Sequence, residues 1–383
     1  MQLGILMNLA PRKLGSFEGW IAAMCAHARS AGHQVDVFGR APAHPSFLAR
    51  LEQLGCGFAT IDSLEDSTYR AIRRLRGYDA LHLNMFAPRS RIALMAYASY
   101  PARVMFVDHT SGLGPGSRRE LPVVAMLKRA ADSITLVRVD GVAGVSGYVS
   151  DRLTRRFRFA RHKVRTIYNG VDLSRFTPAS EVFDLPPEQA QAPHPSPGPA
   201  PAPASPVGIV TVAHLIPHKG VDHLVRAMAL ARSELRLTVV GDGPQLEPLR
   251  ALARELGVAE KVTFAGLRND VHALLAGCDV FVHPAVWEEA FGLTIAEAMA
   301  AGRAVVASRT GGIPELVEDG VSGLLVEPGD PGALARALDL LSARPALRQQ
   351  LGASARSRAQ QRFNLEQCAR EHIRWCEGAV ARM

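Results

Sequence analysis

Short unbroken runs of hydrophobic residues alternate along most of the chain with segments whose apolar positions recur every three or four residues. Unbroken runs are typical of strands that are buried on both faces, and the longer spacing is typical of amphipathic helices. In the first half the runs predict strands at 3–9, 34–40, 78–84, 102–110, 139–146 and 163–170. A helix is predicted over 18–32, where Gly32 occupies the usual position of a C-cap glycine.

The second half repeats this alternation more regularly. Its strands are predicted at 208–215, 235–243, 261–267, 279–285, 303–310 and 322–328, and two of its helices at 220–233 and 244–257. Buried strands that alternate with helices indicate parallel pairing. We therefore predict an α/β chain with a doubly wound, Rossmann-like parallel sheet in each half.

The two halves are separated by a segment that is rich in proline and alanine. Residues 185–206 contain nine prolines, and such a segment forms neither a helix nor a central strand. We predict an N-terminal domain over 1–180, a linker over 181–206 and a C-terminal domain over 207–363. The amphipathic pattern of 364–383 predicts a last helix that packs back on the first domain. Ligands of such sheets bind beyond the carboxyl ends of the strands, so a cleft between the two domains is the expected site.

Charge and cysteine content restrict the class of partner and the compartment. The net charge is +8 and the pI is 9.6, which favours anionic partners such as nucleotides or an anionic membrane surface. The five cysteines are scattered without a CxxC pair, so they predict reduced thiols and neither a zinc site nor a disulfide framework. Neither a signal peptide nor a membrane-spanning run is visible. We expect a cytoplasmic protein, open to peripheral contact with the inner face of a membrane.

One stretch, residues 287–302, combines an apolar helix pattern with three carboxylates. Glu288 and Glu289 lie in the loop that leaves the predicted strand 279–285, and Glu297 lies one turn inside the next helix. Glu288 is interpreted as a surface charge. Glu289 and Glu297 are candidates for a binding role.

The entry of this helix predicts an anion site. Gly292 has no Cβ, so a ligand can approach the backbone closely, and the amides of Gly292, Leu293 and Thr294 lie at the positive end of the helix dipole. Two carboxylates beside such a site would repel a bare phosphate. They suit hydroxyl groups on either side of it, which is the layout of a nucleotide sugar.

The stretch from Glu289 to Glu297 resembles the Glu-x7-Glu signature of the retaining glycosyltransferases of family GT4, which have the GT-B fold. The resemblance extends over most of residues 140–330 through ordered motifs at 142–153, 167–178, 219–229, 239–244, 262–285 and 297–330. It implies two Rossmann-like domains that face across a cleft, with the acceptor on the first domain and the nucleotide sugar on the second.

The resemblance also implies the reaction. A hexose-type sugar would be transferred from a nucleoside diphosphate, most often UDP, to an acceptor hydroxyl with retention of configuration and without a metal or other cofactor. The acceptor would belong to polysaccharide, glycolipid or small-metabolite glycosylation, and no nucleic acid is involved. A non-catalytic, two-lobed protein that binds nucleotide sugars or other solutes is the alternative.

The resemblance assigns roles to individual residues. Lys219 would bind the diphosphate, Glu289 the donor sugar and Glu297 the ribose, while His109 would line the reacting face. His214 stands five residues before Lys219, where the family usually has an arginine. The implied catalytic set is His109, Lys219 and Glu289, and the implied donor-binding set is Gly15, His214, Lys219, Leu267, Phe291, Gly292, Leu293, Thr294 and Glu297.

Two further segments have open interpretations. Residues 151–165 contain seven Arg or Lys side chains, which could contact anionic lipid or a charged acceptor or could form a solvated helix. Residues 110–121, with three glycines and two arginines, are a candidate flap on the acceptor side.

Overall fold

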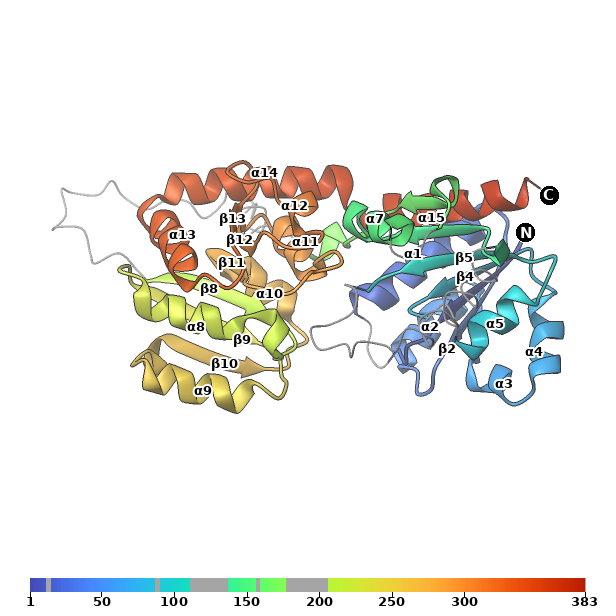
Figure 1. Ribbon diagram of the computed structural model, residues 1–383, viewed down its shortest axis with the longest axis horizontal. Coiled ribbons are helices and arrows are strands. Elements are labelled where there is room, and N and C mark those ends of the chain that lie inside the picture. The colour runs from blue at the N-terminus through green and yellow to red at the C-terminus, as the bar shows by residue number, and fades with distance from the viewer. Residues whose placement is uncertain (12–14, 87–89, 111–136, 156–158, 177–205, 383) are drawn as a thin grey trace, which may run out of the picture. The chain divides into compact units, whose positions relative to one another are not determined.

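The computed structural model describes residues 1–11, 15–86, 90–110, 137–155, 159–176 and 206–382 (Figure 1). The chain forms two compact units. Unit 1 comprises Met1–Asp172, Glu288–Leu293 and Arg362–Met383, and unit 2 comprises Leu173–Trp287 and Thr294–Gln361. The predicted linker lies outside the described residues except for Pro206.

Unit 1 contains a sheet of seven parallel strands in the order β3-β2-β1-β4-β5-β6-β7. The strands are β1 (Gln2–Met7), β2 (Gln34–Gly39), β3 (Gly57–Thr60), β4 (Ala80–Asn84), β5 (Arg103–Asp108), β6 (Gly141–Gly144) and β7 (Val164–Thr166). All of these strands were predicted except β3. It is a four-residue edge strand without a buried residue, so it contains no apolar run to reveal it.

The helices of unit 1 cover both faces of this sheet. They are α1 (Ser16–Ser30), α2 (Pro45–Gln53), α3 (Asp62–Glu65), α4 (Thr68–Leu75), α5 (Arg91–Tyr97), α7 (Gly147–Arg155), the 3₁₀ helix η1 (Arg161–Lys163) and α15 (Leu365–Val380). The last helix, α15, packs on α1, β4 and β5. Gly32 follows α1 with a φ of 80°, as a C-cap glycine does.

Unit 2 contains a six-stranded parallel sheet in the order β10-β9-β8-β11-β12-β13. Its strands, all of them predicted, are β8 (Val207–Val212), β9 (Leu235–Val240), β10 (Val262–Gly266), β11 (Val280–His283), β12 (Ala304–Ser308) and β13 (Leu324–Val326). Every residue of β11 and β12 is buried, which explains their unbroken apolar runs. The strand order reverses between β8 and β11, and ligands of doubly wound sheets bind at such a reversal.

Most helices of unit 2 lie in the chain between one of its strands and the next. They are η2 (Leu173–Arg175), η5 (Pro217–Lys219), α8 (Val221–Leu230), α9 (Leu246–Glu255), η6 (Ala259–Lys261), α10 (Val271–Gly277), α11 (Leu293–Ala300), α12 (Ile313–Leu316), α13 (Pro331–Ala343) and α14 (Pro345–Arg362). The prediction of two doubly wound parallel sheets is confirmed. Among the described helices, none has the length and apolar character needed to cross a bilayer.

Candidate functional site

Lys219 lies on a turn that is fixed to the strand reversal of unit 2. It ends η5, and Gly220 begins α8 with a φ of 63°. A Cβ on Gly220 would collide with the carbonyl oxygen of Pro284, the residue that follows β11. The amide of Val286 donates to the carbonyl of His218 over 3.0 Å, which joins the same two loops a second time. The half-buried Lys219 is therefore held beside the loop that leaves β11.

Helix α11 begins where the sequence predicted an anion site. Gly292 has a φ of 97°, so its left-handed backbone conformation favours glycine at this position. Leu293 and Thr294 are half-buried in the first turn, where backbone amides have no partner within the helix. Glu297 lies one turn further and is only 8% exposed. A carboxylate this buried needs polar partners, and it lies one turn into α11, where the sequence predicted a binding role for Glu297.

Glu289 and Phe291 precede this helix in the segment 288–293 that belongs to unit 1. Glu289 is half-buried. Phe291 is 2% exposed, and its ring packs against Tyr168 and Phe363 at centroid distances of 6.1 and 5.5 Å. The ring of Phe291 is therefore part of an aromatic cluster, and only its backbone remains suited to the donor contact that the resemblance implied.

His214 and Leu267 both follow strands at the carboxyl edge of the same sheet. His214 is exposed, and its Nδ1 donates to the carbonyl of Asp242 over 2.8 Å, so the ring is tied to the turn after β9. In this arrangement only Nε2 is left to face an anion, which is a weaker contact than the arginine of the family. Leu267, directly after β10, is 80% exposed, and so much bare apolar surface suits an apolar ligand group.

Gly15 occupies the N-cap position of α1 in unit 1. Its amide donates to Oε2 of Glu18 over 3.1 Å, and its φ of −95° is open to any residue. The amide of Gly15 is thus already bound by a carboxylate, which does not fit the contact with a diphosphate that the resemblance implied. Residues 12–14, which precede it, lie outside the described residues.

His109 follows β5 and lies against α1. Its ring makes edge contacts with Phe17 and Trp20, each at a centroid distance of 5.5 Å, and its Nε2 lies 3.3 Å from Oδ1 of Asn84. Removal from water lowers the pKa of His109 to about 4, although the neighbouring Asp108 acts to raise it. His109 is therefore neutral near pH 7.

Asp108 has a structural role beside His109. Its Oδ1 accepts from the amide and hydroxyl of Thr110, and its Oδ2 pairs with Arg152 of α7 over 2.9 Å. Arg152 belongs to the basic segment 151–165, whose interpretation as one solvated helix is wrong. The described part of that segment changes from α7 to η1 and β7, and Lys163 donates to the carbonyl of Val139.

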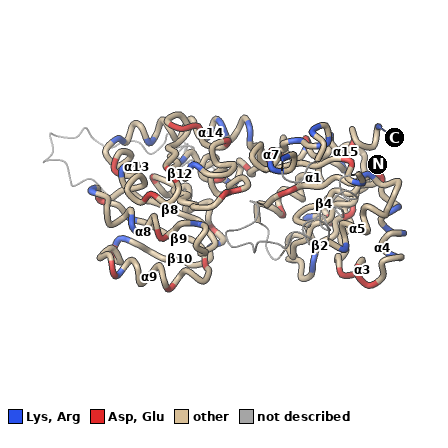
Figure 2. Tube along the Cα trace, in the orientation of Figure 1, with Lys and Arg blue, Asp and Glu red and all other residues tan. Residues whose placement is uncertain are grey.

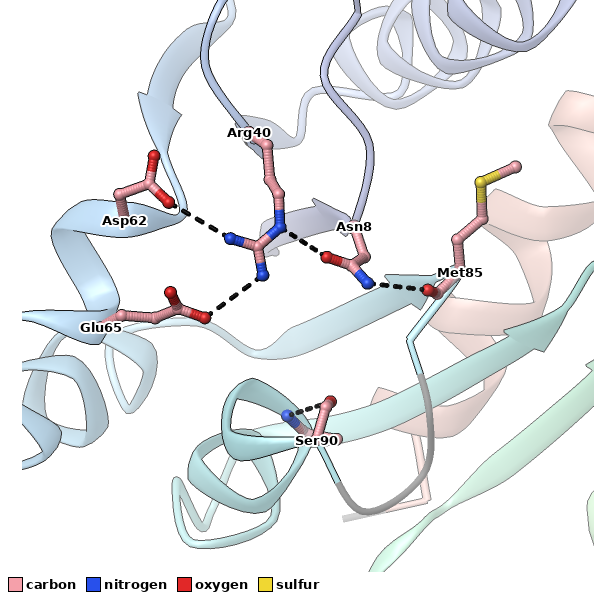
Figure 3. A network of polar contacts seen from close by, with 7 residues as sticks. Asn8, Arg40, Asp62, Glu65, Met85 and Ser90 are labelled. Carbon is pink, nitrogen blue, oxygen red and sulfur yellow. Dashed lines mark hydrogen bonds and ion pairs between the residues drawn. The ribbon is translucent and has the colours of Figure 1, made fainter.

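A polar network at the carboxyl edge of the unit 1 sheet was missed by the sequence analysis (Figure 3). Arg40, which follows β2, donates to Asn8 over 2.7 Å and pairs with Asp62 and Glu65 at 3.2 and 3.3 Å. Asn8 in turn donates to the carbonyl of Met85. Three of these residues follow a strand, and the other two begin and end α3, the short helix after β3, which was the available signal. The candidate flap 110–121 lies outside the described residues apart from Thr110.

Over the described residues no cluster of three or more histidine, cysteine or acidic side chains could hold a metal ion. The five cysteines are all buried and unpaired by disulfides.

Comparison with known proteins places this geometry in a family. The model of the family described as Glycosyl transferases group 1 matches residues 200–358, and that of Glycosyltransferase Family 4 matches residues 18–175. A GDP-mannose-dependent monoacylated alpha-(1-6)-phosphatidylinositol monomannoside mannosyltransferase of Corynebacterium glutamicum is 31% identical over 313 residues, which cover 77% of this chain and 75% of that protein. The chain belongs to glycosyltransferase family 4.

Other relatives agree with this family. A GDP-mannose-dependent alpha-(1-6)-phosphatidylinositol monomannoside mannosyltransferase of Mycobacterium tuberculosis is 32% identical over 65% of this chain. The match spans 61% of that relative, less than two thirds of its length. Among solved structures, Anabaena HepE in complex with UDP superimposes with a TM-score of 0.77 at 22% identity, over 99% of this chain and 100% of that one. The two Rossmann-like sheets of this family member are those of the GT-B fold.

Proposed function

We propose that this protein is a retaining glycosyltransferase that transfers a hexose from a nucleoside diphosphate to a hydroxyl group. The observation that carries the proposal is the Lys219 turn, which Gly220 and Val286 fix to the loop after β11 at the strand reversal of unit 2. A cation held at this place, followed by the first-turn amides of α11, suits a diphosphate.

Each of these residues binds a different part of the nucleotide sugar. Lys219 and the amides of Leu293 and Thr294 bind the diphosphate and stabilise the charge that develops on it as the sugar leaves. Glu297 accepts hydrogen bonds from the ribose, and Glu289 accepts one from the sugar. No cofactor or metal takes part, because protein groups meet the charge of the leaving phosphate.

Retention follows if the acceptor attacks from the face that the nucleotide leaves. The departing phosphate oxygen then takes the proton of the acceptor hydroxyl, while the sugar–phosphate bond breaks and the new glycosidic bond forms. The protein contributes position and charge stabilisation and no nucleophile of its own. Neutral His109 lines the reacting face.

The base of the donor is the first question for experiment. The relatives above are named as GDP-mannose-dependent, whereas the HepE structure contains UDP. We therefore propose a panel of UDP, GDP, ADP and their hexose conjugates in a thermal-shift assay without added metal. A ligand at 100 times its Kd should stabilise the fold by about 2.7 kcal/mol.

Two lysines make this test specific. Lys219→Ala should abolish the shift, whereas Lys261→Ala should not, because Lys261 also ends a 3₁₀ helix but precedes β10, at the opposite edge of the sheet. A shift without sugar transfer to any acceptor would favour the non-catalytic binding protein. Absence of a shift with every nucleotide, from folded protein, would contradict the donor site.

The acceptor is proposed to be a hydroxyl compound that binds to unit 1, and contact with an anionic membrane surface is proposed for a lipid-linked acceptor. The net charge of +8 supports such contact. Arg152 and Lys163 bond internally, so the basic segment offers less charge to a membrane than the sequence suggested. Sedimentation with phosphatidylglycerol vesicles that is lost in high salt and absent with phosphatidylcholine would support the contact.

A further inference from the structure

A chain of buried side chains leads from His109 into the interior of unit 1. His109 Nε2 lies 3.3 Å from Asn84 Oδ1, Asn84 Nδ2 lies 3.0 Å from His82 Nδ1, and His82 Nε2 lies 3.2 Å from His372 Nδ1. His82, Asn84 and His372 are 0% exposed. The chain therefore joins the end of β5 to β4 and then to α15.

The orientation of the Asn84 amide is fixed by the backbone around it. Its Nδ2 lies 3.3 Å from the carbonyl oxygen of Leu6 and 3.4 Å from that of His82. Carbonyl oxygens only accept hydrogen bonds, so the NH₂ group must face them, and the opposite orientation would bring oxygens together. Consequently Oδ1 of Asn84 faces His109 as an acceptor.

The three imidazoles are neutral, so each carries a single proton. Burial lowers the pKa of His82 to about 3 and that of His109 to about 4, and it lowers the pKa of His372 well below the ordinary value. Since Asn84 accepts from His109 and donates to His82, only one pattern satisfies every pair. His109 donates from Nε2, His82 donates from Nε2 to Nδ1 of His372, and His372 carries its proton on Nε2.

The last histidine in this series of side chains, His372, is not explained by packing alone. Nε2 of His372 and Nε1 of Trp20 are buried without a hydrogen-bond partner in the described residues, and their rings lie 5.0 Å apart between centroids. An unsatisfied buried donor costs about 1–3 kcal/mol, so an apolar side chain at 372 would hold α15 at least as well. Docking of α15 therefore does not by itself explain a histidine at position 372.

We propose that Asn84, His82 and His372 are positioning residues that hold His109 with its proton on Nε2, so that Nδ1 accepts a hydrogen bond from a substrate hydroxyl. The contact with a substrate hydroxyl rests on the proposed function, whereas the position of the proton on His109 does not. His109 then acts as an acceptor for a sugar or acceptor hydroxyl and contributes no positive charge to the diphosphate.

Long-range ¹H–¹⁵N spectra of the imidazoles test the position of this proton directly, with His109 assigned from a His109→Gln variant. Wild-type protein at pH 7 should show His109 in the Nε2–H form alone. Asn84→Leu is similar in shape but has no acceptor, so both tautomers of His109 should appear, and kcat should fall about tenfold with unchanged nucleotide affinity. His372→Leu should give a smaller change of the same kind, and His372→Gln, whose Oε1 can accept from His82, should restore the wild-type spectrum.

His33→Gln is the matched control, since it replaces the imidazole that contacts Glu377 of α15 over 2.7 Å and leaves the hydrogen-bonded side chains from His372 to His109 intact. It should alter neither the spectrum of His109 nor kcat. Wild-type His109 in the Nδ1–H form, or an Asn84→Leu spectrum identical to wild type, would overturn the inference. A change of the His109 tautomer with unaltered kcat would overturn the proposed hydrogen bond from the substrate to His109. Wild-type protein that transfers no sugar would refute the proposed function, and the spectra would then test only the tautomer of His109.

Discussion

Gly220 shows how a single residue fixes the position of Lys219. Its φ of 63° is almost that of Gly257, which is 68°, but the two glycines differ in their surroundings. A Cβ on Gly257 meets nothing within 4 Å, whereas one on Gly220 meets the carbonyl of Pro284. A substitution at Gly257 therefore tests backbone strain alone. A substitution at Gly220 tests the same strain together with the contact that joins the loops after β8 and β11.

Substitution of both glycines by alanine tests this contact. Gly257→Ala should lower the free energy of unfolding by about 1–2 kcal/mol, the ordinary cost of a left-handed residue with a side chain. Gly220→Ala should cost roughly 3 kcal/mol or more, because the Pro284 loop must also move, and it should weaken nucleotide binding. Urea unfolding and titration calorimetry measure the two effects. Equal losses in both variants would mean that the contact with Pro284 has no energetic weight.

The two glutamates of the site should separate binding from turnover. Glu297→Gln, the milder substitution at a position that is 8% exposed, should weaken binding of the free nucleoside diphosphate about tenfold through loss of a charged hydrogen bond to the ribose. Glu289→Gln should leave that affinity unchanged and lower kcat, because it contacts only the sugar. Calorimetry with the nucleotide and initial rates with the donor decide this. An equal loss of nucleotide affinity in both would contradict the division of roles.

The structure adds a requirement at some of the predicted residues and restricts the predicted role of others. Gly292 was expected to allow close approach of a ligand, and its positive φ adds a requirement that no pattern reveals. Phe291 was placed in the donor site, yet its ring packs with Tyr168 and Phe363, which are far away in the chain. Contacts between distant segments depend on the fold and cannot be inferred from spacing along the sequence.

At the level of elements, α15 illustrates both the strength and the limit of periodicity. The amphipathic pattern predicted the helix and its apolar face, and in the structure that face packs on α1, β4 and β5. It did not reveal that His372 lies within the buried face beside His82 of β4. A buried histidine pair of this kind makes the stability of the element depend on pH.

The sign of this dependence follows from the direction of the pKa shifts. The pKa of His82 falls to about 3 in the folded protein and that of His372 is also lowered, whereas both are near 6.5 in an unfolded chain. The unfolded state therefore binds more protons below pH 6.5. Stability from these groups is complete above that pH and is lost as the pH falls toward the folded values; for His82 the loss is about 2 kcal/mol by pH 5.

Urea unfolding of wild type and His372→Leu at pH 7 and pH 5 checks this expectation. The loss of stability between the two pH values should be smaller in the variant, because one buried neutral histidine has been removed. The partly exposed pairs His27–Glu366 and His33–Glu377 are present in both proteins, so their effects cancel in the comparison. The same loss in both proteins would show that His372 does not stay neutral in the folded state.

At the scale of the whole molecule, the units do not follow the order of the chain. The sequence indicated one domain before the proline-rich segment and one after it, with a last helix that returns to the first. The structure also assigns the six residues Glu288–Leu293, in the middle of the second half, to unit 1. Hydrophobic periodicity locates strands and helices, but membership of a unit depends on side-chain partners, such as Tyr168 and Phe363 for Phe291.

Acid and nucleotide should therefore act on different units. The neutral buried histidines His82 and His372 belong to unit 1, whereas the Lys219 turn belongs to unit 2. Hydrogen exchange by mass spectrometry, corrected for the intrinsic effect of pH, should show faster exchange of β4 and α15 at pH 5 than at pH 7, with β8 and β12 unchanged. The nucleotide that gives a thermal shift should slow exchange around 217–221 and at the start of α11.

His372→Leu gives this experiment its control, because it should reduce the acid effect on α15 and leave the nucleotide effect on unit 2 intact. Equal acid-induced exchange in both sheets would mean that the molecule opens as one cooperative unit, and the buried histidines would then not be its cause. Protection by the nucleotide confined to the Lys219 turn and α11 would locate the anion at the strand reversal between β8 and β11. If the nucleotide slowed hydrogen exchange only in other segments, the proposed donor site would be contradicted, since Lys219 and the helix amides are the groups proposed to hold the diphosphate.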